Sequence, residues 1–352
     1  MGFDGVFKCV AYRPNYPAPP IHAAGEWRLV ESVEGQYDWT DLRRCLDAAL
    51  QANMWIIPEI VINIPPDWFV DRYPDSILRD NRGEIVPANV DAPYLLSPWF
   101  VASGDADADL IPFISSFLAL VSDYPNVAGI MVGNFLLNNL PWRLGSGPDF
   151  TYWPVFDAYA LADYQGQFGT QPPATWANYL AMSPSAQSAF RGWLIAAISD
   201  NLQHRYLPWI ASYAGWKIIN ASMWDNNGVR ASIFTTMTPE MVVPKQAAIQ
   251  AVGLPGVVIN DDNMGDCGLA SMHQQDINLA HGNGFLTVGE RVPGTCGWAE
   301  MFAMWQAFNP RPNGFISIGE PDPYWIGQFR TLYGPAPEPL PFSVYAPVVL
   351  RD

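Results

Sequence analysis

Apolar and polar positions follow two alternating patterns along this chain. Short runs rich in Val, Ile and Phe, typical of buried strands, are separated by longer stretches in which apolar residues recur about every 3.6 positions, which is typical of helices with one buried face. The predicted strands are residues 6–12, 26–31, 54–62, 127–133, 216–223, 256–260, 285–289 and 315–319. The predicted helices are residues 40–53, 110–123, 174–181, 185–213, 239–252, 269–281, 299–308 and 323–332. This alternation predicts an α/β fold with a parallel sheet, and eight units predict a closed (β/α)₈ TIM barrel.

Three connections depart from the regular pattern. The link 13–25 is rich in proline and has no helical pattern. The connections 63–109 and 134–173, after the third and fourth predicted strands, are long and rich in Pro, Asp, Trp and Tyr. In a barrel they would rise from the C-terminal face, where active sites lie. We therefore predict one barrel domain over residues 1–333, followed by a proline-rich linker and a terminal extended segment over residues 334–352.

The last two predicted strands repeat one sequence. Residues 283–290 are NGFLTVGE, and residues 313–320 are NGFISIGE. Asn-Gly suits the turn that ends a helix, and strand side chains alternate, so each glutamate should share a face with the residue two positions before it. Because neighbouring strands lie about 4.8 Å apart, the repeat predicts Glu290 and Glu320 on the rim of one pocket. That spacing is compatible with the carboxylate pair of a retaining glycosidase. A helix cap or an ion pair is the alternative role for each glutamate.

Charge and motifs narrow the classes of partner. The net charge is −16 and the chain has only three lysines, which opposes binding to nucleic acid or to an anionic membrane surface. No apolar run approaches the roughly 20 residues of a membrane helix. Glycine-rich nucleotide loops and nucleophile elbows are absent from the sequence, so we expect no cofactor. The oligomeric state is not predicted.

The four cysteines fall into two groups. Cys9 and Cys45 lie in apolar strand and helix patterns and are predicted to be buried thiols. Cys267 and Cys296 lie in the matched sequences GDCG and GTCG, and a disulfide between them is a hypothesis. It would indicate an oxidising compartment, so we expect a location outside the cell or at its surface. No cysteine or histidine spacing suggests zinc.

Aromatic residues are abundant, with 15 Trp and 15 Tyr. Rings that carry a polar group suit half-wet binding faces such as sugar sites, and core filling is the alternative for each ring. We expect two or three of the following rim tryptophans to stack on sugar: Trp68, Trp99, Trp142, Trp153, Trp224, Trp298 and Trp325. Arg28 and His22 are further candidates for substrate contact. Glu59, inside the apolar run IIPEIVI, needs a partner such as Arg28 or a raised pKa.

The N-terminal third resembles a known family. It contains W-R-L-V-E followed by E-G-Q-Y-D-W, then a strand ending in P-P-D-W, then Y-P-D followed by D-N-R-G-E. This set, within about residues 25–135, resembles family 42 glycoside hydrolases, which are β-galactosidase-like members of a large retaining (β/α)₈ clan; FRGWL at 190–194 is a weaker match. The resemblance implies a neutral oligo- or polysaccharide substrate, an Asn-Glu acid/base pair ending the fourth strand and a nucleophilic glutamate ending the seventh. Glu290 fits the nucleophile.

The fourth strand departs from that pattern. VAGIMVGNF supplies Asn134, but Phe135 stands where the acid is expected, and phenylalanine donates no proton. Losing a positioned acid costs about 10²–10⁴-fold in rate. The candidates for another acid, all at predicted strand ends, are Glu320, Asp225, Asp261 and Asp262. Three hypotheses follow: a glycoside hydrolase with Glu290 as nucleophile or base, a carbohydrate-binding protein that has lost turnover, and a structural or surface interaction protein.

Overall fold

A computed structural model gives the fold of most of the chain. It describes residues 5–7, 9–12, 21–52, 54–85, 94–127, 130–132, 155–211, 219–222, 247, 251, 257–261, 267–284, 286–291, 296–317, 323–333 and 348–349. The structural statements below concern these residues.

Six strands form one parallel sheet in the order β10-β9-β8-β7-β6-β5. Their bounds are β5 Glu59–Ile60, β6 Ile130–Val132, β7 Ile219–Ser222, β8 Val257–Asp261, β9 Leu286–Arg291 and β10 Gly314–Ser317. A second parallel pair joins β1 (Gly5–Phe7) to β4 (Trp55–Ile57), and only Pro58 separates β4 from β5. The parallel α/β sheet predicted from the alternation is therefore confirmed. No pairing between β10 and β1 is found among the described residues, so closure of the barrel stays a prediction.

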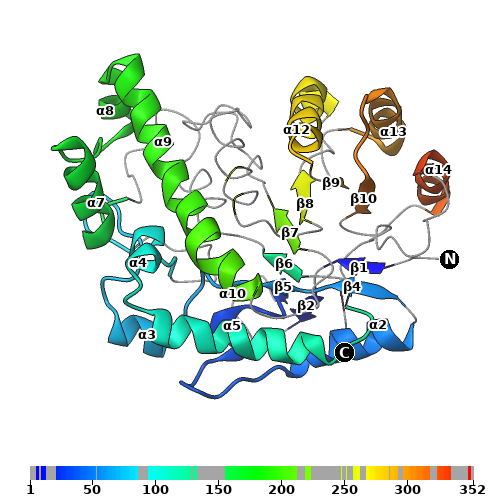
Figure 1. The fold of residues 1–352 in the computed structure, drawn as a ribbon, viewed down its shortest axis with the longest axis horizontal. Coiled ribbons are helices and arrows are strands. Elements are labelled where there is room, and N and C mark those ends of the chain that lie inside the picture. Colours follow the sequence, from blue (N-terminus) through cyan, green and yellow to red (C-terminus); the bar gives the residue numbers. More distant parts are fainter. Residues whose placement is uncertain are drawn as a thin grey trace.

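Helices surround the strands (Figure 1), with α5, α9 and α12 to α14 on the outside. The helices are α1 Trp27–Val30, α2 Thr40–Gln51, α3 Asp67–Arg72, α4 Pro98–Ser103, α5 Asp107–Ser122, α7 Ala158–Phe168, α8 Trp176–Ala181, α9 Pro184–Asn201, α10 Leu207–Ala211, α12 Ala270–Gly282, α13 Trp298–Ala307 and α14 Pro323–Tyr333. A π-helical turn, Leu202–Tyr206, joins α9 to α10. The predicted helix 239–252 lies almost wholly outside the described residues. Every other predicted helix is present, and α3, α4 and α7 add short helices within the two long connections.

The predicted strand 26–31 is wrong, because the chain leaves the sheet after Glu26. Glu26 makes a single parallel bridge to Val61. The amides of Val30 and Glu31 then donate to the carbonyls of Glu26 and Trp27, four residues earlier, which is the helical pattern of α1. A side chain at Gly25 would lie 2.1 Å from the carbonyl oxygen of Glu59, so glycine is required where these two segments cross.

The first strand region is also more divided than predicted. β2 (Cys9–Tyr12) pairs antiparallel with β3 (Ile21–Ala23), which lies in the proline-rich link. β11 (Val348–Val349) pairs parallel with β2, so the last extended segment docks on the N-terminal strands. Whether a domain boundary falls at residue 333 stays a prediction.

Both cysteine pairs are disulfides. Cys267 and Cys296 are bonded, as hypothesised, with their Cα atoms 5.8 Å apart. Cys9 and Cys45 are bonded as well, with a Cα separation of 5.9 Å, so the prediction of two free buried thiols was wrong. Both residues are buried, as predicted, but the strand-to-helix packing of β2 on α2 also brings their sulfur atoms together. Burial is equally compatible with a thiol and a disulfide, so the sequence pattern could not separate them.

The two long connections are joined by a buried carboxylate. The Asp157 side chain caps α7 by accepting a hydrogen bond from the amide of Ala160 at 3.0 Å. The same oxygen accepts from the hydroxyl of Ser97, also at 3.0 Å, and Ser97 itself caps α4. Asp157 is fully buried. Burial raises the pKa of its carboxyl from 3.8 to about 6, against the opposing effect of these hydrogen bonds.

This pKa predicts a pH-dependent stability. A raised native pKa means that the folded protein keeps a proton that the unfolded chain loses between about pH 4 and pH 6. The stability that the protonated Asp157 carboxyl contributes is therefore fully present below pH 4 and is lost as the pH rises through 6. A shift of about two units corresponds to about 3 kcal/mol. The free energy of unfolding in urea should fall between pH 4 and pH 8, and it should fall by about 3 kcal/mol less in Asp157→Asn than in the parent. Equal losses would contradict the prediction, and the exposed Asp105→Asn is the control.

Candidate functional site

The register of the parallel sheet sorts its residues onto two faces. Glu59 is level with Met131, which is level with Asn220 of β7. Asn220 is level with Val258, and Val258 with Leu286. Because residues two apart in a strand share a face, these pairings give one face the following polar residues: Glu59, Asn220, Ser222, Asn260 and Glu290.

The opposite face is mainly apolar and is covered by helix. Its residues include Ile60, Val132, Ala221, Ile259 and Thr287, which are level with one another. The Thr287 hydroxyl lies 3.1 Å from Nε2 of His281 on α12, so α12 lies against this face. Strands of a parallel sheet are usually apolar on both sides. Five polar residues on the face away from α12 therefore mark that face as the candidate site, with Ser222 and Asn260 the nearest in level to Glu290.

The two strands of the repeat are paired out of step. Glu290 is level with Ile316, and Val288 is level with Gly314. Each element of the second repeat is thus displaced along the strands relative to the first. Glu320 lies outside the described residues and comes four positions after Ile316 in the sequence. Four residues of extended chain span about 13 Å, so the spacing of about 4.8 Å expected for neighbouring equivalents does not follow from this register.

The register also separates Asp261 from Glu290. Asp261 ends β8 level with Gly289, so it belongs to the face covered by α12. Asn260, one position earlier, is level with Val288 and shares the face of Glu290. The side chains of Asp261 and Glu290 themselves are not among those described. Sequence inspection missed Asn220, Ser222 and Asn260 as candidate site residues, although their odd-even spacing within apolar strands was a usable signal.

Several predicted site residues lie outside the described residues. They are Asp225, Asp262, Glu320, Asn134, Trp142, Trp153 and Trp224. His22 lies in β3 opposite Ala11, and its side chain is not described. Arg28 is a half-buried residue of α1 rather than of a strand, and its amide donates to the carbonyl of Ile64 at 3.1 Å. The predicted roles of these residues stay predictions.

Trp68 is engaged in packing. Its ring meets Trp27 edge-on with the centroids 6.2 Å apart, and its indole nitrogen donates to the carbonyl of Glu31 at 2.7 Å. The guanidinium carbon of Arg72 lies 5.3 Å from the ring centroid. Trp68 is half-buried and has these packing contacts, and its role in sugar stacking stays a prediction. Trp99 is also buried, stacked on Trp193 at 4.5 Å.

A buried carboxylate lies beside this aromatic group. Glu31 accepts hydrogen bonds from the indole of Trp27 at 2.7 Å and from the amide of Gly35 at 2.8 Å. Burial raises its pKa, while these bonds oppose the rise. Burial, together with the nearby charge of Glu31, raises the pKa of Tyr37 to about 12. The carboxyl thus has donors that hold it in place, which is typical of a structural acid.

Trp298 and Trp325 lie on the helices that follow the last two strands of the sheet. Trp298 opens α13 and meets Phe329 edge-on at 6.5 Å, and Trp325 of α14 meets Phe302 of α13 at 5.7 Å. Both side chains are half-buried. They join α13 to α14, and their predicted sugar contact stays a prediction.

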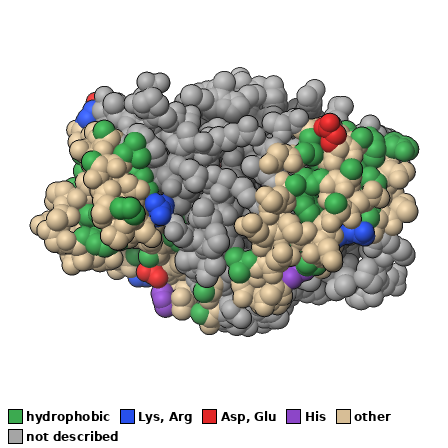
Figure 2. Space-filling model, turned by 90° about the horizontal axis from the view of Figure 1, so that it is seen from above, with side chains coloured by type: hydrophobic (Ala, Val, Ile, Leu, Met, Phe, Trp, Pro, Cys, Tyr) green, Lys and Arg blue, Asp and Glu red, His purple; other side chains and the backbone are tan. Residues whose placement is uncertain are grey.

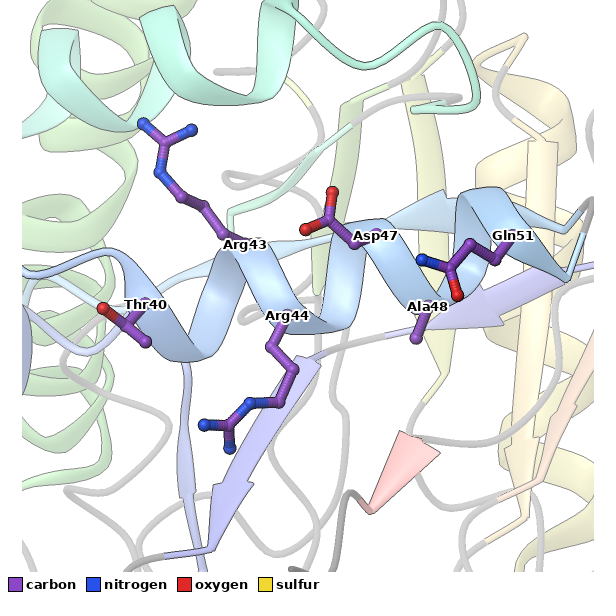
Figure 3. Close-up of a pocket in the computed structure, with 6 residues that line it drawn as sticks. All are labelled: Thr40, Arg43, Arg44, Asp47, Ala48 and Gln51. Carbon is purple, nitrogen blue, oxygen red and sulfur yellow. The ribbon is translucent and has the colours of Figure 1, made fainter.

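A shallow groove of about 500 Å³ runs along α2. Figure 3 shows Arg43 and Arg44 pointing to opposite sides of the helix, with Asp47 one turn further along on the same side as Arg43. The Asp47 carboxylate accepts a hydrogen bond from the Tyr124 hydroxyl at 2.9 Å. None of the predicted site residues is among its described lining, so this groove is separate from the candidate site.

The exposed apolar residues of the described ranges are scattered over the surface. Figure 2 shows small separate groups of apolar side chains on the two flanks of this view. Large exposed apolar residues come from different elements and are Val33, Leu50, Ile85, Ile111, Phe168, Leu180 and Tyr324. Within the described ranges, no helix has both the length and the apolar character to cross a membrane. The same ranges contain no cluster of three side chains able to hold a metal ion.

Comparison with known proteins supports the resemblance over part of the chain. The glycoside hydrolase family 42 model, described as beta-galactosidase, matches residues 22–94. The chain aligns with the beta-galactosidase of the psychrophilic Marinomonas ef1 at 15% identity and a TM-score of 0.48, covering 83% of this chain and 48% of that one. For the beta-galactosidase of Rahnella sp. R3 the identity is 10%, the TM-score 0.43 and the coverage 84% and 45%.

A third solved structure and a sequence search complete the comparison. The intracellular xylanase of Thermoanaerobacterium saccharolyticum aligns at 14% identity and a TM-score of 0.28, covering 76% of this chain and 74% of that one. The chain thus spans less than half the length of the two beta-galactosidases. No curated protein matches it.

Proposed function

We propose that this chain is a glycoside hydrolase of β-galactosidase type, built on a closed (β/α)₈ barrel and acting on a neutral carbohydrate. Glu290 is the nucleophile or base. The polar face that ends at Glu290 carries the proposal, because it brings Asn220, Ser222 and Asn260 to the same side of the sheet. Hydroxyl and amide groups on the same face as a carboxylate suit recognition of sugar hydroxyls. The family 42 match to residues 22–94 supports the substrate class.

The general acid is proposed to be Asp262, ahead of Asp225 and Glu320. Asp261 is level with Gly289, so one further residue of extended chain would bring Asp262 level with Glu290. Neighbouring strands lie about 4.8 Å apart, and a pair of carboxyl groups about 5–5.5 Å apart fits a retaining mechanism. Glu290 would attack the anomeric carbon while Asp262 protonates the leaving oxygen. Water would then release the sugar with Asp262 acting as base.

A second candidate function is carbohydrate binding without turnover. Phe135 stands where the family resemblance expects the acid/base, and the residue level with Glu290 on β10 is Ile316, not an acid. A site with Glu290 and amide groups but without an acid would still hold a sugar. It would lose the large share of rate that protonation of a poor leaving group supplies.

A leaving-group series on the unaltered protein tests the proposal. Aryl β-galactosides of graded phenol pKa and lactose are compared by kcat/KM, and proton NMR follows the configuration of the first product. We expect turnover of every member, with retained configuration. Inversion would indicate carboxyls about 6.5–9.5 Å apart and would remove Asp262 as the partner. Binding of galactose or lactose with no turnover of the most activated aryl glycoside would establish the binding function instead.

A further inference from the structure

The Cys267–Cys296 disulfide lies just beyond the two strands that carry the proposed carboxylates. β8 ends at Asp261, and Cys267 comes six residues later. Glu290 lies near the end of β9, and Cys296 comes six residues after it. Asp261 is level with Gly289, so the two segments are cross-linked six and seven residues beyond a level pair. Glu290 is inside the covalent ring that this disulfide closes.

The cross-link is anchored in a hydrophobic cluster. Cys296 is 8% exposed and belongs to the cluster formed with Ile277 of α12, Met301 and Trp305 of α13 and Phe329 of α14. Cys267 is partly buried against the same cluster. Trp305 and Phe329 meet edge-on at 5.1 Å. The disulfide thus fixes the starts of α12 and α13 to a packed hydrophobic cluster.

We infer that the Cys267–Cys296 disulfide is a positioning element that holds the carboxyl ends of β8 and β9 together for the reaction at Glu290. This inference rests on the proposed function. Catalytic groups must keep their separation closely, and a misplacement of about 1 Å can cost about 10²-fold in rate. With the strands paired on one side and the disulfide on the other, both connections 262–266 and 292–295 are tied at each end.

The second disulfide supplies a matched control. Cys9–Cys45 joins β2 to α2 and lies in the other hydrophobic cluster. Its two cysteines are 36 residues apart in sequence, against 29 for Cys267 and Cys296. Because loop length governs the entropic contribution of a disulfide, the two should contribute similarly to the stability of the fold. Neither Cys9 nor Cys45 belongs to the candidate site.

The test compares Cys267→Ala/Cys296→Ala with Cys9→Ala/Cys45→Ala, at a temperature where both remain folded by circular dichroism. For an activated aryl β-galactoside we expect the first pair to lose about 10–100-fold in kcat with KM changed less than threefold. The second double variant should keep the parent kcat, although both double variants should have a lower melting temperature than the parent. Equal kcat in the two double variants, or losses that follow stability alone, would overturn the inference.

Hydrogen exchange distinguishes a failure of this inference from a failure of the proposed function. If the parent protein hydrolyses nothing, the proposed function fails, and the amides of residues 257–261 and 286–291 are followed in both double variants. Faster exchange in these strands for Cys267→Ala/Cys296→Ala alone supports the positioning of the strand ends. Unchanged exchange in that variant overturns it, whatever the activity. A double variant that does not fold is replaced by mild reduction of the parent, with the released thiols located by alkylation.

Discussion

Replacing Glu290 with glutamine is expected to lower kcat/KM for an aryl β-galactoside by about 10³-fold or more. The amide keeps the shape of the side chain but can neither attack the anomeric carbon nor take a proton. Removal of a positioned base costs about 10²–10⁴-fold in other hydrolases, and removal of a nucleophile costs more. A loss of about 10³-fold corresponds to about 4 kcal/mol of transition-state stabilisation. An activated phenol leaves without acid help, so this substrate tests Glu290 separately from Asp262.

A matched surface variant controls for the change of charge. Glu84 is exposed, and its carboxylate pairs with Arg82 at 2.6 Å with 63% of its side chain accessible. Exposed pairs of this kind contribute about 0–1 kcal/mol, so Glu84→Gln should retain the parent kcat/KM. Turnover of Glu290→Gln within threefold of the Glu84→Gln value would remove Glu290 from the reaction. Sugar affinity measured by calorimetry on both variants then shows whether Glu290 contributes to binding alone.

Most helices and turns of this fold were predictable because their signals lie within a few neighbouring residues of the sequence. Helices α2, α5, α12, α13 and α14 follow apolar spacings that the sequence displays directly. Gly284 has a φ of 80°, as the first Asn-Gly pair predicts for a turn after a helix. The strand predicted at 26–31 is wrong because only Glu26 bridges to the sheet, at Val61, before the chain turns into α1. No rule of periodicity distinguishes so short a crossing from a strand.

The candidate site was predictable by residue type but not by register. The sequence identifies Glu290 and Glu320 as equivalents in a repeat, and equivalence suggests that they face each other. The stagger between neighbouring strands of a barrel-like sheet is a tertiary property, and it sets Ile316 level with Glu290. The same register moves Asp261 to the helix-covered face. The pairing of neighbouring strands therefore decides which acids can act together. A single sequence does not show that pairing.

Replacing Trp27 with alanine is expected to lower the free energy of unfolding by about 5 kcal/mol. Trp27 is fully buried, stacks on Phe113 at 5.4 Å and meets Phe69 at 4.7 Å. Truncation of a buried tryptophan costs about 3–5 kcal/mol through lost transfer energy and the cavity that remains. The buried Glu31 carboxylate also loses its indole donor, and a hydrogen bond to a charged group contributes about 1.5–3 kcal/mol.

The variant Trp27→Phe separates these two contributions. Phenylalanine keeps an aromatic ring against Phe113 but donates no hydrogen bond, so we expect a loss of about 2 kcal/mol, mainly from Glu31. Because losing this donor raises the Glu31 pKa further, the loss should be larger at pH 8 than at pH 5. Urea unfolding at both pH values measures it. If Trp27→Ala does not fold, Trp27→Phe still tests whether the indole N–H stabilises the ionised Glu31. A loss that is the same at pH 5 and pH 8 would show that the indole N–H does not stabilise the ionised Glu31.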